Sequence, residues 1–133
     1  FAQKVHMNLA IVDKRRPKAN VSEVMNIIGD VKGKTCILYD DMVDTAGSLC
    51  NAAKALVEVG GAKEVYACAT HGVLSGPAFE RIQNSVIQEM VFHNTIPLPD
   101  PCPCDKIKML DVSPIFARCI EHIHDGTSIA DLF

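Results

Sequence analysis

The sequence predicts an α/β domain in three layers, with a mostly parallel sheet and helices on both of its faces. Short apolar runs alternate along the chain with segments of helical periodicity. Several runs are apolar at successive positions, as strands covered on both faces are. Strand, helix, strand in this order implies right-handed crossovers, and such folds bind ligands beyond the carboxyl ends of their strands.

Five short segments predict strands because they are rich in β-branched, aromatic and other apolar residues. They are residues 9–13, 35–40, 65–70, 89–95 and 107–113. Three helices are predicted between and after them. The first ends at Gly60 and Gly61, and the second begins at residues 75–77, where Ser75 would cap it and Pro77 fits its first turn. The third runs from Pro114 to His124 and stops at Gly126. Their inward faces are predicted to carry Leu49, Ala53, Leu56 and Val57; Phe79, Ile82 and Val86; and Phe116, Ile120 and Ile123.

Composition narrows the class of protein. The 133 residues carry a formal net charge of −3 and no basic face interleaved with aromatic residues, which argues against a nucleic-acid partner. No apolar run reaches the length of a membrane span, so no membrane partner is expected. Six cysteines without a signal-peptide pattern predict a reducing, cytoplasmic location. Cys102 and Cys104 could ligate a metal, but no second cysteine pair accompanies them, and a proline-stiffened loop is the alternative.

Residues 39–48, YDDMVDTAGS, carry the clearest chemistry. They join a predicted strand to a predicted helix. The backbone N–H groups of Thr45, Ala46, Gly47 and Ser48 would meet an anion such as phosphate at the helix start. The carboxylates of Asp40, Asp41 and Asp44 would then bind sugar hydroxyls or a divalent cation. A sugar phosphate satisfies both halves of the segment. In the alternative, Asp44 or Thr45 merely caps the helix.

Residues 39–48 resemble the loop that binds ribose 5-phosphate or phosphoribosyl diphosphate in the type I phosphoribosyltransferase fold. Residues 11–34, 70–82, 94–97 and 123–133 are similar to the C-terminal half of the ribose-phosphate diphosphokinase (phosphoribosyl diphosphate synthetase) family. The resemblance implies that residues 1–133 are a single C-terminal, phosphoribosyltransferase-like domain of a longer two-domain subunit. It also implies transfer of a diphosphoryl group from Mg-ATP to ribose 5-phosphate, in a cytoplasmic homo-hexamer activated by inorganic phosphate.

The resemblance also assigns roles to residues. Asp40 and Asp41 match the acidic pair that faces the ribose hydroxyls and Mg²⁺. The five residues that match the loop around the 5-phosphate are Asp44, Thr45, Ala46, Gly47 and Ser48. Ser128 matches a hydroxyl of the allosteric site, although Ala130 departs from the family pattern. The family's catalytic Lys and Arg loop and its ATP site precede the segment matching Phe1, so no catalytic residue is assigned and the isolated chain is expected to be inactive.

Two other functions compete with this interpretation. The same acidic loop occurs in base-salvage phosphoribosyltransferases, where Asp44 would act on the base. A non-catalytic, regulatory synthetase-like subunit is the second. Such subunits often lose or interrupt the acidic loop, whereas Asp40, Asp41 and Asp44 are all present.

Overall fold

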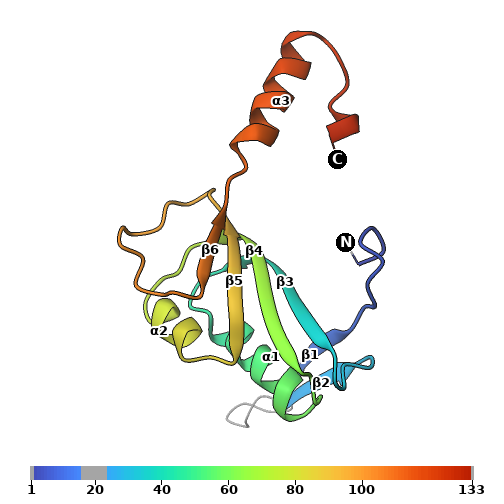
Figure 1. Cartoon of the computed structure of the whole chain (residues 1–133), viewed down its shortest axis with the longest axis vertical. Coiled ribbons are helices and arrows are strands. Elements are labelled where there is room, and N and C mark those ends of the chain that lie inside the picture. The colour runs from blue at the N-terminus through green and yellow to red at the C-terminus, as the bar shows by residue number, and fades with distance from the viewer. Residues whose placement is uncertain (1, 16–23, 133) are drawn as a thin grey trace.

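A computed structural model describes residues 2–15 and 24–132 of the chain. A parallel sheet with strand order β3-β4-β5-β6 forms the body of the fold (Figure 1). Its strands are β3 (Thr35–Val43), β4 (Glu64–Gly72), β5 (Ile87–His93) and β6 (Ile107–Leu110). Each of these strands contains or overlaps a segment that the sequence predicted. The α/β class and the parallel sheet are therefore confirmed.

Two helices pack on this sheet and on each other. The helix α1 (Gly47–Glu58) connects β3 to β4 and contacts both strands, and α2 (Ala78–Gln83) lies beside α1. Their buried residues share one core with alternate residues of β4 and β5. The core includes Leu49, Ala53, Leu56, Ala78, Ile82, Val65, Ala67, Ala69, Met90 and Phe92. The predicted inward faces of these two helices are thus confirmed at Leu49, Ala53, Leu56 and Ile82.

The opposite face of the sheet is more open. Ile37, Tyr39 and Tyr66 are 45%, 61% and 36% exposed. These side chains share a face because Ile37 pairs with Tyr66 in the strand register. Within residues 2–15 and 24–132, α1 and α2 cover the other face, and we observe no helix packed over Tyr39.

The first predicted strand does not join the parallel sheet. Instead, β1 (Ile11–Arg15) pairs antiparallel with β2 (Val24–Ile28), which was not predicted. This two-stranded unit contacts the body where β2 meets α1. The apolar run of β2 ends at Gly29, whose φ of 116° suits glycine. That run is the sequence signal that could have identified β2.

The helix α3 (Ser113–His124) begins and ends close to the predicted residues, and Gly126 follows it with a φ of 67°. Its predicted inward face was wrong, because Phe116, Ile120 and Ile123 are 61%, 66% and 68% exposed. The helix projects beyond the sheet (Figure 1), and its neighbour is the short 3₁₀ helix η1 (Ala130–Leu132). Periodicity identified the apolar stripe, but it does not specify what covers a stripe. No helix in the described parts of the chain is long and apolar enough to cross a membrane.

The contrast between two phenylalanines generates a stability prediction. Phe92 is fully buried in the core, whereas Phe116 is 61% exposed on α3. We expect Phe92→Ala to lower the free energy of unfolding of this chain by about 3–5 kcal/mol, because it leaves a cavity. The matched control Phe116→Ala should change it by less than about 0.5 kcal/mol. Urea unfolding followed by circular dichroism measures both, and equal losses would contradict this placement of the core.

Candidate functional site

The parallel pairing of β3 and β4 brings two turns to one edge of the sheet. Val43, the last residue of β3, pairs in register with Gly72, the last residue of β4. The turn of residues 44–46 leads into α1, and residues 73–77 lead into α2. Because both turns leave the same carboxyl edge, the segment predicted to bind an anion lies against a chain segment about 30 residues further on.

The turn into α1 has an unusual backbone. Ala46 is the residue before the helix and adopts the left-handed conformation, with φ 59°. A residue with a Cβ carries a strain of about 1–3 kcal/mol there. Ala46 is nevertheless only 4% exposed, and its carbonyl accepts the first helical hydrogen bond, from the Cys50 amide at 3.0 Å.

Among the described residues the N-cap position of α1 belongs to Ala46 and no side-chain cap bond is observed, so the capping role considered for Asp44 or Thr45 is wrong. Its first turn also contains no acidic residue. The first N–H groups of a helix cannot be reached by the helix's own carbonyls, and they lie at the positive end of its dipole. The start of α1 therefore retains the character of an anion-binding site.

Asp44 is held by Ser75 instead. The Ser75 hydroxyl donates a hydrogen bond to Asp44 Oδ1, and the Ser75 amide donates to the Asp44 carbonyl at 3.1 Å. The predicted capping of α2 by Ser75 is wrong, because α2 has Pro77 at its cap and no side-chain cap bond. A hydroxyl near a predicted helix start usually caps that helix. Here the partner of the Ser75 hydroxyl is Asp44, on the turn between β3 and α1, which only the tertiary fold brings close to Ser75.

Asp40 and Asp41 lie inside β3, near its carboxyl end, and both are exposed. Successive residues of a strand point to opposite faces of the sheet. Asp40 shares the face of its register partner Ala69, which is buried under the helices. Asp41 therefore faces the open side, while its amide donates to Asp40 Oδ1 at 2.9 Å. The structure thus gathers Asp44 to Ser48 around the helix start and turns Asp40 and Asp41 to different faces of β3.

Sequence reasoning missed Arg81. Its Nη1 donates to the Thr45 carbonyl at 2.9 Å, across 36 residues of sequence. A Cβ added to Gly47 would lie 3.2 Å from the same nitrogen, so the absence of a side chain at Gly47 leaves room for the guanidinium. No local pattern marks Arg81, because its partner is a backbone oxygen of a distant turn.

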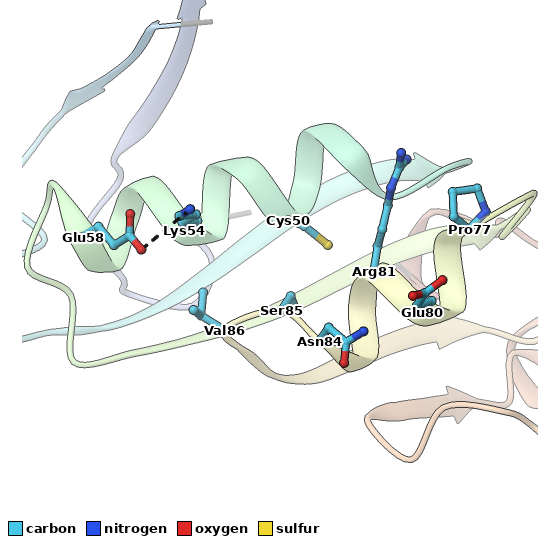
Figure 2. Close-up of a pocket in the computed structure, with 9 residues that line it drawn as sticks. All are labelled: Cys50, Lys54, Glu58, Pro77, Glu80, Arg81, Asn84, Ser85 and Val86. Atoms are coloured by element: carbon cyan, nitrogen blue, oxygen red, sulfur yellow. Dashed lines mark ion pairs between the residues drawn. The ribbon is translucent and has the colours of Figure 1, made fainter. Parts of the chain in front are cut away.

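Arg81 also lines a cavity of about 560 Å³ between α1 and α2, with Cys50, Lys54, Glu58 and Glu80 among its other lining residues (Figure 2). Lys54 and Glu58 form an ion pair at 3.9 Å. Burial raises the pKa of the Cys50 thiol, although the nearby cations Arg81 and Lys106 oppose this. The cavity is therefore lined by a protonated thiol and by both acidic and basic side chains, next to the turn between β3 and α1.

Hydrogen bonds made by side chains connect the rest of the carboxyl edge. His71 Nδ1 lies 2.9 Å from Thr95 Oγ1, whose hydroxyl donates to the Thr70 carbonyl at 3.1 Å. At the next strand, Asn94 Nδ2 donates to Asp111 Oδ1 at 2.7 Å. Bonds from the Ser113 hydroxyl and amide, with that of Asn94, lower the pKa of Asp111. These contacts link β4 to β5 and β5 to β6.

Two further predictions concern residues away from this edge. Cys104 is 2% exposed, and the Cys102 thiol donates a weak hydrogen bond to the Cys104 carbonyl at 3.5 Å. These contacts agree with a structural, proline-stiffened loop rather than a metal site. In the described part of the chain, no three His, Cys, Asp or Glu side chains are grouped to hold a metal ion.

The Ser128 hydroxyl accepts a hydrogen bond from the Ala130 amide at 3.1 Å, which is a local role at the start of η1. Its allosteric role stays a prediction.

A parallel α/β sheet with a helix start at its carboxyl edge defines an α/β domain of the class that binds ligands beyond the carboxyl ends of its strands. The family can also be stated. The chain belongs to the phosphoribosyl synthetase-associated domain family, whose sequence model matches residues 2–133.

Individual relatives agree with this family. The chain is 61% identical over 133 residues to a ribose-phosphate pyrophosphokinase of Clostridium tetani and 54% identical to one of Bacillus subtilis. It spans 41% and 42% of the lengths of these two relatives. A crystal structure of phosphoribosylpyrophosphate synthetase from Mycobacterium smegmatis superposes with a TM-score of 0.81 at 36% identity, covering 94% of this chain and 40% of that one.

The contacts of Asp111 generate a prediction about pH. Since its pKa is lowered in the folded chain, Asp111 stabilises the fold above its unfolded pKa of about 4, and this contribution is lost as the pH falls through the lowered value. We expect Ser113→Ala to raise the pKa of Asp111 toward 3.8, because it removes the hydroxyl bond that contributes most. Carboxyl ¹³C shifts followed by NMR measure this pKa. An Asp111 that titrates at its ordinary value in the wild-type chain would contradict the geometry.

Proposed function

We propose that this chain is the ribose 5-phosphate-binding domain of a ribose-phosphate diphosphokinase, and that it forms the C-terminal domain of a longer two-domain subunit. The full subunit would convert ATP and ribose 5-phosphate to AMP and phosphoribosyl diphosphate. The observation that carries the proposal is the uncapped start of α1, held in a left-handed turn at Ala46 beside Asp44 and Thr45. The names of the relatives and the family match support the enzyme class.

The sugar 5-phosphate would occupy the turn of residues 44–48. Backbone N–H groups at the helix start and the hydroxyls of Thr45 and Ser48 would donate to its oxygens. No carboxylate in the first turn of α1 opposes a bound anion there. The carboxylate of Asp44 is already engaged by Ser75, which keeps its charge turned toward the second turn.

The ribose hydroxyls and a Mg²⁺ ion would lie beside Asp40 and Asp41. Mg²⁺ binds through one or two carboxylates and takes its remaining oxygens from water and substrate. One carboxylate fits that mode, since Asp40 and Asp41 are both exposed near the carboxyl end of β3 but lie on different faces, and the described residues offer no complete protein cage. When bound, Mg²⁺ would neutralise charge on the reacting phosphates.

The contribution of this domain to the reaction would be positioning. The anomeric hydroxyl of ribose 5-phosphate attacks the β-phosphorus of ATP, a new oxygen–phosphorus bond forms, and AMP leaves. Phosphoryl-type transfer depends mainly on alignment and charge neutralisation. Residues 40–48 would fix the sugar, while the nucleotide and the catalytic Lys and Arg would come from the rest of the subunit. We therefore propose that the isolated chain binds sugar phosphate without turnover.

The remaining features of the family are also proposals for this protein. They comprise activation by inorganic phosphate at a site that includes Ser128, self-association as a homo-hexamer, and a cytoplasmic location. All six cysteines are free thiols, which suits a reducing compartment.

Among the competing functions, base salvage gains no support from the relatives, which are named as pyrophosphokinases. The regulatory subunit stays open, and turnover by the full subunit would exclude it.

Calorimetric titration of the chain with ribose 5-phosphate and Mg²⁺ tests the proposal. We expect the Asp44→Asn, Ser48→Ala double variant to weaken ribose 5-phosphate binding about tenfold or more. It removes the carboxylate that accepts the Ser75 hydrogen bond and a hydroxyl donor of the turn. The matched control is Asp105→Asn, which neutralises an exposed carboxylate in the connection between β5 and β6.

If Asp105→Asn weakened binding equally, the loss of affinity would reflect the change in net charge rather than contacts in the turn. Unchanged binding by the double variant would place the sugar phosphate elsewhere. The same titration in excess EDTA separates the metal from the phosphate contacts. If Asp40 and Asp41 act through Mg²⁺, removing the ion should weaken wild-type binding, and Asp40→Asn, Asp41→Asn should then cause little further loss.

A further inference from the structure

Four successive carbonyl groups, from residue 43 to residue 46, line the turn between β3 and α1. Three of them accept hydrogen bonds from backbone amides, which side-chain substitution leaves in place. These pairs are Val73 and Leu74 to Val43, Ser75 to Asp44, and Cys50 to Ala46. The Thr45 carbonyl accepts instead from a side chain, Nη1 of Arg81, at 2.9 Å. The orientation of this one peptide group therefore depends on the identity of residue 81.

That peptide group also contains an N–H. The Thr45 carbonyl and the Ala46 N–H belong to one planar trans unit, so they point in opposite directions. Holding the carbonyl oxygen toward Arg81 directs the Ala46 N–H away from it. A residue in the left-handed conformation, as Ala46 is, helps to group successive N–H groups into an anion-binding concavity. Arg81 thus determines where the first donor of the turn points.

We infer that Arg81 is a positioning residue for the sugar phosphate, which acts through the Thr45 carbonyl to orient the backbone amide of Ala46. This inference rests on the function proposed above. Arg81 would contact no substrate atom itself. Its guanidinium reaches the turn from the last turn of α2, beside the cavity between α1 and α2 (Figure 2).

Two features argue that geometry, rather than charge alone, selects arginine here. The guanidinium fits closely, since a Cβ at Gly47 would lie 3.2 Å from its Nη1. Its planar fork holds one N–H on a fixed acceptor and keeps others for solvent or neighbours, which a lysine ammonium on its flexible stem does less well. Lys54 lines the same cavity but pairs with Glu58 at 3.9 Å, and so provides a cation that does not contact the turn.

The test uses ¹⁵N-labelled chain and two measurements. The first is the backbone order parameter of Ala46, which we expect to fall from above about 0.8 in the wild type to below about 0.6 in Arg81→Ala. The second is the dissociation constant for ribose 5-phosphate with Mg²⁺, which we expect to rise about tenfold or more. Guanidinium chloride at a non-denaturing concentration should enter the open cavity and restore part of the affinity of Arg81→Ala.

Two further variants make the outcome decisive. Arg81→Lys keeps the charge and should still weaken binding, whereas wild-type affinity in this variant would show that attraction suffices and would overturn the inference. Lys54→Ala removes a cation from the same cavity and should leave both readouts unchanged; a tenfold loss there would also overturn it. If the wild-type chain binds and Arg81→Ala binds equally well, the inference fails alone. If the wild-type chain does not bind ribose 5-phosphate, the proposed function fails first.

Discussion

The parallel pairing of β3 with β4 is the constraint on which the candidate site depends. Parallel strands need a crossover, and α1 provides it, so the turn into α1 and the turn after β4 must leave the same edge of the sheet. Ser75 and Arg81 reach residues 44 and 45 only because of this arrangement. The turn proposed to bind the phosphate is therefore a product of sheet topology as much as of its own sequence.

Backbone strain at that turn is offset by burial and by hydrogen bonds. Ala46 adopts a left-handed conformation that costs a residue with a Cβ about 1–3 kcal/mol. Burial of Ala46, and hydrogen bonds to the carbonyls on either side of it, offset this cost. Contacts within the chain itself therefore hold the backbone of this helix start. Such preorganisation suits a domain whose proposed contribution to catalysis is alignment.

Features encoded by local pattern could be predicted from the sequence. The strands of the parallel sheet, the start and end of α1 and the strand-to-helix connection within residues 39–48 depend on residues close together in the chain. The misses depend on distant partners. Ser75 and Arg81 contact the turn across 31 and 36 residues, β2 is defined by pairing with β1, and the exposure of Phe116 depends on where α3 projects. Hydrophobic periodicity specifies none of these relations.

The central claim is that the start of α1 binds the phosphate of a sugar phosphate. Amide chemical-shift mapping of the ¹⁵N-labelled chain during titration with ribose 5-phosphate and Mg²⁺ tests it most directly. The account predicts the largest shifts at the amides of residues 45–48, with smaller shifts at Asp40 and Asp41. Largest shifts at the residues that line the cavity between α1 and α2, such as Lys54 and Asn84, would contradict it.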